Sequence, residues 1–250
     1  MNILYRDDYL VSVDKPPGLL VHRTGLDAGE TRFALQLLRD QIGQPVWPVH
    51  RLDKGTSGVL LFALDAATAR ALGQSFERGG AMRKTYLAIV RGWPPESGEI
   101  DHPLKRMPDD MRSEREEIQD ALTHYRTLER YELPLAQGGF ATTRCALVEL
   151  QPVTGRRHQL RRHMKHVAHP IIGDATHGKG PLNRALAGLL GLQRLWLHAC
   201  RLELAHPVTG REVAIEAAPG EEWQRWLLAA TSFTGHALPA GSAPLQNANP

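Results

Sequence analysis

The apolar run GVLLFAL at residues 58–64 constrains the fold more than any other segment of this chain. It is far shorter than the roughly 18 apolar residues that a membrane-spanning helix needs. A short, continuous apolar run between polar segments is typical of a buried strand. The run therefore predicts that this part of the chain lies inside a β-sheet.

Alternation of apolar and polar residues predicts further strands elsewhere in the chain. They lie at residues 4–5, 9–13, 84–90, 122–130, 143–150, 195–205 and 212–215. Helical spacing of apolar residues predicts helices at 31–42, 65–76, 154–166 and 221–230. Strands outnumber helices and do not alternate with them regularly, and the phosphate-binding loops GxGxxG, GxxxxGKS and GxxxxGKT do not occur. We therefore expect an α+β fold.

Length and composition limit the class of protein. With 250 residues, 42% of them hydrophobic and 23% charged, the chain is not predominantly disordered. We expect one domain over 1–236, a disordered tail at 237–250, and an exposed, mobile insertion at 105–120, with a flap over a ligand as one hypothesis. The N-terminus does not resemble a signal peptide, so we expect a cytoplasmic location. Two cysteines without a CxxC pair favour neither a disulfide framework nor a zinc site.

Charge and aromatic content say little about ligands when averaged over the chain. The formal net charge is only +3, so binding of nucleic acid would depend on local basic clusters. Aromatic residues make up 6% of the chain, which does not favour a surface that binds single strands by stacking.

The segment HRLDKGTSG at residues 50–58 contains a single acid, Asp53, between Arg51 and Lys54. Flanking cations favour the ionised carboxylate, which could act as a nucleophile or a base at the mouth of a sheet. An aspartate that simply makes a turn or a cap fits the same spacing. The residues alone leave both interpretations open.

The segment TGRRHQLRRHMKH at 154–166 predicts a helix with an apolar side and a basic side. The basic residues that fan across one face are Arg157, His158, Arg161, Arg162 and Lys165. Such a face suits contacts to phosphate groups, although a solvated basic face has the same pattern.

Two other features have a structural and a functional interpretation. The histidines at 158, 163, 166 and 169 could bind a metal, but their directions diverge and no acid or cysteine accompanies them at helical spacing, so we expect no metal site. Tyr86 is a lone aromatic residue in the predicted strand 84–90, where core packing is the default. A phenol near cations could also accept a proton or stack on a base.

Four segments, in this order along the chain, resemble the RluA-type pseudouridine synthases. They are HRLDKGTSG (50–58), RKTYLAIVRG (83–92), TGRRHQLRRHMKHVAHPIIGD (154–174) and LHACRLELAHPVTG (197–210). The resemblance implies a mixed, mostly antiparallel central sheet flanked by helices. Many members carry an N-terminal RNA-binding domain of the S4 type, which we do not expect here because the pattern starts almost at Met1.

The resemblance also implies roles for single residues. Asp53 matches the catalytic aspartate, Tyr86 the active-site tyrosine, and Arg161 the arginine that pairs with the aspartate. Arg51 matches the arginine that enters the RNA stack in place of the target nucleotide. Further expected RNA contacts are Arg156, Arg157, His158, Arg162 and Lys165.

The activity implied is isomerisation of a uridine in RNA to pseudouridine, with neither a metal nor an organic cofactor. We expect the protein to be a monomer. Further segments, such as KPPGLLVHRTGLD at 15–27 and THYRTLE at 123–129, are similar to the members that modify tRNA. We therefore expect tRNA as the partner, with a uridine of the acceptor or T stem as the target. Ribosomal RNA remains an alternative substrate, and an inactive RNA-binding module or a zinc hydrolase are alternatives of other classes.

Overall fold

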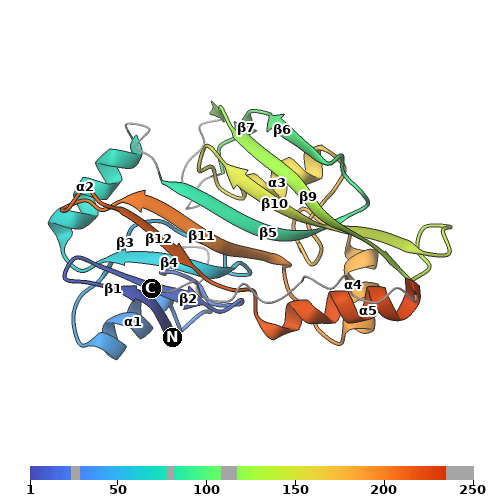
Figure 1. Ribbon diagram of the computed structural model, residues 1–250, viewed down its shortest axis with the longest axis horizontal. Helices are drawn as coiled ribbons and strands as arrows, with labels where there is room; N and C mark the ends of the chain where they lie inside the picture. Colours follow the sequence, from blue (N-terminus) through green and yellow to red (C-terminus); the bar gives the residue numbers. More distant parts are fainter. Residues whose placement is uncertain (24–28, 78–81, 108–116, 235–250) are drawn as a thin grey trace.

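The computed structural model describes residues 1–23, 29–77, 82–107 and 117–234, which form one long sheet with helices packed on it (Figure 1). The helices are α1 (Ala34–Ile42), α2 (Ala66–Glu77), α3 (Gln159–His166), α4 (Gly180–Leu190), the 3-10 helix η1 (Glu221–Trp223) and α5 (Gln224–Thr234). None of the described helices is both long enough and apolar enough to cross a membrane.

The described residues also form twelve strands, numbered in chain order. They are β1 (Asn2–Arg6), β2 (Leu10–Lys15), β3 (Trp47–Pro48), β4 (Ser57–Ala63), β5 (Arg83–Arg91), β6 (Ser97–Asp101), β7 (Leu104–Lys105), β8 (Ile118–Gln119), β9 (Leu122–Leu133), β10 (Thr143–Pro152), β11 (Leu197–Ala205) and β12 (Glu212–Glu216).

The main sheet has the strand order β1-β2-β4-β11-β5-β10-β9-β6, with β3 paired to β4 and β12 paired to β11. Within the described residues, β4 and β11 run parallel and the other strand pairs run antiparallel. The prediction of a mixed, mostly antiparallel sheet is therefore confirmed. β7 and β8 form a separate two-stranded pair.

Strand β4 is apolar throughout because both of its faces are covered. Successive side chains of a strand point to opposite faces. Leu60 and Phe62 belong to the core that α1 and α3 cover, whereas Val59 and Leu61 belong to the core that α2 and β12 cover. A third core lies under α4 and α5, around Trp196.

Gly58 allows β4 and β11 to approach each other closely. Its φ is +105°, and an added Cβ would lie 2.2 Å from the carbonyl oxygen of Ala199 on β11. Only glycine tolerates both the conformation and the contact. The turn that contains Asp53 therefore joins a strand whose position in the sheet is fixed.

Most predicted elements are present, but two helices begin later than predicted, and β3, β6 and α4 were not predicted. α1 begins at Ala34 rather than at residue 31, and α3 begins at Gln159, so residues 154–158 are not helical. α4 was not predicted, although Leu182, Leu186 and Leu190 recur every fourth residue and are buried. The described ends of the predicted 105–120 insertion pair as β7 and β8. Residues 108–116 and the predicted tail 237–250 lie outside the described residues.

Candidate active site

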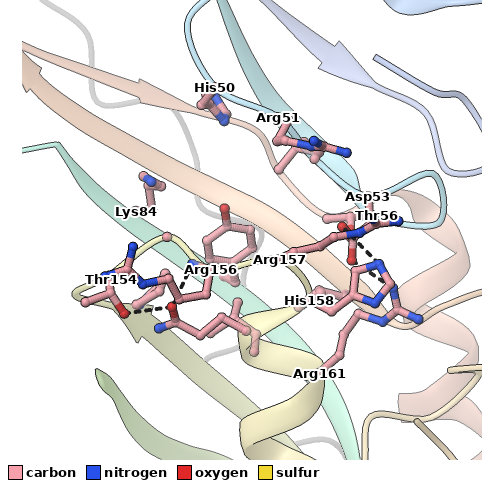
Figure 2. A pocket seen from close by; sticks show the side chains of 17 residues that line it. His50, Arg51, Asp53, Thr56, Lys84, Thr154, Arg156, Arg157, His158 and Arg161 are labelled. Atoms are coloured by element: carbon pink, nitrogen blue, oxygen red, sulfur yellow. Dashed lines mark hydrogen bonds and ion pairs between the residues drawn. The ribbon is translucent and has the colours of Figure 1, made fainter. Parts of the chain in front are cut away.

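A cavity of about 340 Å³ lies beside the turn that precedes β4 (Figure 2). Four parts of the chain form its wall: residues 50–56, strand β5, the segment from 152 into α3, and Leu197 at the start of β11. Pockets that hold small ligands have volumes of roughly 300–1,000 Å³. Of the predicted site residues, the cavity brings together Arg51, Asp53, Tyr86, Arg156, Arg157, His158 and Arg161.

Backbone and side-chain contacts hold the Asp53 turn in place. The Thr56 amide donates to the carbonyl of Asp53 at 3.0 Å, and the Gly18 amide donates to the carbonyl of Lys54 at 2.8 Å. The fully buried Lys15 ammonium donates to the same Lys54 carbonyl at 3.3 Å. Burial lowers the pKa of Lys15 to about 7, although the charge of Asp53 opposes the shift. Lys15 belongs to the KPPG turn, for which no role was predicted.

Arg161 lies between two carboxylates, Asp53 and Asp174. Its Nη1 donates to Asp53 Oδ2 at 2.9 Å, while Nε and Nη2 donate to the two oxygens of Asp174 at 2.8 Å each. Burial alone would lower the pKa of Arg161, but the hydrogen bonds to Asp174 and the charge of Asp53 raise it overall. One guanidinium between two carboxylates compensates only one of the two carboxylate charges. Asp53 presents the other charge to the cavity, because its side chain is 26% exposed and that of Asp174 is 0% exposed.

Asp174 is a site residue that the sequence analysis missed. Its Oδ1 also accepts the backbone amides of Thr176 and His177, at 2.9 Å each. Burial would raise the pKa of Asp174, but the bonds from Arg161 and His177 lower it overall. Asp174 ends one of the segments that carry the family resemblance. However, its 13-residue separation from Arg161 fits neither strand nor helix periodicity, so no local pattern indicated the contact.

Tyr86, Lys84 and His50 line the cavity wall at and near β5. Burial, and then the charge of Asp53, raise the pKa of Tyr86, so its phenol stays protonated at neutral pH. Burial also lowers the pKa of Lys84, and burial together with the nearby Lys84 charge lowers the pKa of His50 to about 3. Tyr86 therefore presents an aromatic face and a neutral hydroxyl.

His158 stands at the start of α3 in a left-handed conformation, with φ 54°. Its Nε2 lies 3.8 Å from Asp53 Oδ1, and its Nδ1 lies 3.1 Å from His177 Nε2. Burial lowers the pKa of His158 despite the charge of Asp53. His177 is a second residue near the site that was not predicted.

The prediction of one basic helix face is wrong. Arg157 and His158 precede the helix, and Arg161 is buried against carboxylates rather than facing solvent. Lys165 is exposed and lines neither of the two cavities that α3 borders. The helical wheel assumed helix from residue 157, but the chain turns at His158.

A smaller basic pocket of about 150 Å³ adjoins the main cavity. Arg156 and Arg157 line both spaces. The other cations that line the smaller pocket are Lys105, Arg106 and Arg162. Arg106 pairs with Glu117 at 2.9 Å, and Arg162 donates to the carbonyl of Lys105 at 2.9 Å. The pocket therefore carries excess positive charge beside the site of Asp53.

Gln159 fixes the loop that carries these arginines, and it was not predicted either. Its Oε1 accepts the backbone amide of Arg156 at 2.9 Å and the hydroxyl of Thr154 at 2.7 Å. Its Nε2 donates to the carbonyl of Leu122 and the hydroxyl of Thr123 on β9, at 2.9 and 3.0 Å. The loop is thus tied to the sheet.

The histidines of α3 make contacts other than metal ligation. His163 bonds the Thr123 hydroxyl and the His102 carbonyl, each at 3.0 Å. Across the described parts of the chain, no group of three or more His, Cys, Asp or Glu side chains is placed to hold a metal ion.

The chain is similar to known proteins over most of its length. Residues 9–166 match the family described as RNA pseudouridylate synthase. The tRNA pseudouridine synthase C of Vibrio cholerae is 51% identical over 228 residues, which cover 90% of this chain and 93% of that protein. The protein of the same name from Haemophilus influenzae is 48% identical over 229 residues, covering 90% and 95%.

Solved structures show the same fold. Human RNA Pseudouridylate Synthase Domain Containing 4 superposes with a TM-score of 0.66 at 29% identity, covering 92% of each chain. Human RNA Pseudouridylate Synthase Domain Containing 1 has a TM-score of 0.67 at 27% identity, covering 87% of this chain and 83% of that one.

Proposed function

The chain belongs to the RNA pseudouridylate synthase family, and we propose that it isomerises a uridine of tRNA to pseudouridine. The observation that carries this proposal is the Asp53–Arg161–Asp174 cluster, which holds one carboxylate at the wall of a ligand-sized cavity. The names of the similar bacterial proteins support tRNA as the substrate. We further propose that the protein works as a monomer in the cytoplasm, where tRNA is found.

The reaction rearranges one nucleotide without an external group. The N1–C1′ bond of the uridine breaks, the uracil turns, and C5 bonds to C1′. The proton at C5 is then lost and N1 gains one, so no oxidant or reductant is needed. We propose that Asp53 supplies the negative charge that attacks C1′ or C6 or assists the departure of uracil. Arg161 and Asp174 orient that charge.

The target base must leave its stack before Asp53 can reach it. Unpairing and unstacking cost a few kcal/mol, which contacts elsewhere must offset. We propose that Arg51 fills the vacated place and that Arg156 and Arg157 bind flanking phosphates, with the basic pocket beside them extending this contact. Tyr86 packs on the flipped uracil, and because its phenol stays protonated it does not favour the alternative role as acceptor of the C5 proton.

An alternative of another class is a protein that binds RNA without modifying it. The cluster around Asp53 argues against that alternative. Taking a charged arginine and a charged aspartate out of water is costly, and simple RNA binding needs no such pair. A ribosomal RNA substrate would use the same cavity, so only an assay separates the two substrates.

The test is to incubate the purified protein with unmodified tRNA and, separately, with fragments of large-subunit ribosomal RNA. Pseudouridine is then mapped after carbodiimide treatment. We expect a defined site in tRNA and no product with Asp53→Asn. Product in ribosomal RNA alone would contradict the proposal that tRNA is the substrate. Absence of product in both RNAs would contradict the proposed activity.

A further inference from the structure

The two oxygens of the Asp53 carboxylate have different neighbours. Oδ2 accepts a hydrogen bond from Arg161, whereas Oδ1 faces Nε2 of His158 at 3.8 Å. Figure 2 shows both side chains directed at the carboxylate. At 3.8 Å the imidazole is too far for a hydrogen bond, but a small movement of the ring would complete one.

The other nitrogen of His158 is engaged by His177. His158 Nδ1 and His177 Nε2 are 3.1 Å apart, and the rings meet edge to face. Burial lowers the pKa of both histidines, so both rings are neutral at neutral pH. A neutral imidazole has one N–H and one acceptor nitrogen. Because one proton lies between the facing nitrogens, the two tautomers are linked.

Asp53 decides which of the linked tautomers is favoured. If His158 donated to His177, its bare Nε2 would direct a lone pair at the carboxylate. If His177 donates instead, His158 carries its proton on Nε2 and directs an N–H at the carboxylate. The second arrangement is favoured because a carboxylate attracts a donor and repels a lone pair.

Asp174 anchors the histidine pair as well as the guanidinium. The carboxylate that binds Arg161 also accepts the backbone amide of His177. Two chains of contacts thus lead from this one buried group to Asp53, one through Arg161 and the other through His177 and His158. If the contacts through Arg161 shift, the contacts through the two histidines still hold Asp53 in place, and the reverse also applies.

We propose that His177 is a positioning residue that donates its Nε2–H to His158 and so directs the Nε2–H of His158 at Asp53 Oδ1. This inference rests on the proposed function, because Asp53 is the group that it serves. When RNA fills the cavity and displaces water, Arg161 and His158 hold the two oxygens of Asp53 and keep the carboxylate aligned with the flipped uridine.

Acid disrupts this arrangement. When both histidines carry a second proton, both facing nitrogens are protonated and two cations lie near the arginines. Asp53, Arg161 and Arg157 act on His158, and Asp174, Arg161, Lys165 and Arg162 act on His177. Since burial lowers both pKa values, both rings are neutral and the pair is intact at neutral pH. A first added proton can sit on His177 Nδ1 without breaking the contact, so the pair is lost only at a lower pH, where both rings are charged.

Two substitutions of His177 test the donor role. His177→Ala removes the side-chain donor but keeps the backbone amide that Asp174 accepts. We expect kcat on tRNA to fall roughly tenfold with KM unchanged, as for loss of one hydrogen bond to a charged site. His177→Gln keeps an N–H near the position of Nε2 and should restore most of kcat. Because glutamine does not titrate, this variant should lack the part of the fall in kcat at low pH that His177 causes. His124→Ala, an exposed histidine on β9, is the matched control.

Nitrogen NMR of the free protein tests the tautomer directly. We expect His158 to be protonated on Nε2 in the wild type and to become a tautomer mixture in His177→Ala. A wild-type proton on Nδ1, an unchanged kcat in His177→Ala, or a Gln variant as impaired as the Ala variant would each overturn the proposal. The spectrum does not depend on turnover, so failure of the wild type to modify tRNA would count against the proposed function alone.

Discussion

Two buried arginines, Arg161 and Arg194, flank the segment that contains Asp53, and they are compensated differently. Arg161 binds two carboxylates, and its pKa is raised overall. Arg194 donates to the Ser57 hydroxyl at 2.7 Å, pairs with Glu222, and packs near Trp196 and Trp223. Burial lowers its pKa, and the nearby carboxylates do not reverse that shift.

The difference shows how one residue type serves two purposes. Arg194 with one bonded carboxylate makes a neutral pair that joins β4 to the region before α5. Arg161 with two carboxylates leaves one negative charge over, and that charge borders the cavity. The number of acids bonded to a buried arginine thus separates a structural pair from a site with charge available for chemistry.

Removing the negative charge of Asp53 should have the largest effect on activity. Asp53→Asn keeps the size of the side chain, and Arg161 keeps its bonds to Asp174. We expect kcat for pseudouridine formation to fall at least about a thousandfold, with tRNA binding and the thermal midpoint nearly unchanged. Glu222→Gln, the equivalent change beside Arg194, should retain activity. Substantial product from Asp53→Asn would refute the role of the carboxylate.

Removing the inner carboxylate should affect both stability and activity. Asp174→Asn leaves buried Arg161 with one charged partner and weakens the support of His177. We expect the free energy of unfolding to fall by about 3 kcal/mol, as for a broken buried ion pair, and kcat to fall as well. Urea titration and the tRNA assay measure the two effects. An unchanged free energy would mean that Asp174 does not hold Arg161.

The same variant predicts a change in acid sensitivity. The pKa of Asp174 is lowered by folding, so its stabilisation is present above the ordinary aspartate pKa and is lost as pH falls toward the folded value. Wild-type stability should therefore decline in that acid range. Asp174→Asn should decline less, as measured by urea titration at several pH values.

Removing the contacts of Arg194 should lower the free energy of unfolding without changing the activity of the folded enzyme. Arg194→Met keeps an apolar stem against the tryptophans but leaves Ser57 and Glu222 without this partner. We expect the free energy of unfolding to fall by about 2 kcal/mol, less than for a fully buried pair because the Glu222 side chain is 28% exposed. The kcat of the folded enzyme should stay within about twofold. A large loss of kcat would show that the two networks are coupled.

The smallest expected effect belongs to a single phosphate contact. Arg156→Ala should weaken tRNA binding and reduce the slope of log affinity against log salt by about 1. At saturating tRNA, kcat should change little. Arg39→Ala, an exposed arginine on α1, is the matched control. An unchanged slope of log affinity against log salt would show that Arg156 does not contact a phosphate of the tRNA.

Local patterns predicted the elements better than their ends. Asp65, the first residue of the predicted helix 65–76, caps α2, because its carboxylate accepts the amide of Thr68 at 2.8 Å. The start of α3 was misplaced because the predicted helix 154–166 ran through Gly155, whereas α3 begins only at Gln159, after the left-handed residue His158. The left-handed backbone there depends on contacts with β9 and the 174–177 loop, which no local pattern records.

The residues of the candidate site also fall into two groups, those that the sequence indicated and those that it did not. Asp53, Tyr86 and Arg161 were expected from their segments, and the structure places all three at one cavity. Asp174, His177 and Gln159 were missed because their function depends on partners far along the chain. Their spacings to those partners, 13, 19 and 36 residues, carry no period of a helix or strand.

The sequence by itself determined the buried strand β4, most of the other helices and strands, and the segments that mark the family. These properties depend on side-chain periodicity and on short contiguous motifs, which a linear chain displays directly. The family resemblance implied that Arg161 pairs with Asp53, 108 residues away, but only the tertiary structure decided that Asp174 binds the other side of the guanidinium. A buried charge is satisfied by whichever partners the packed sheet brings within about 3 Å, and that choice is made in space rather than along the chain.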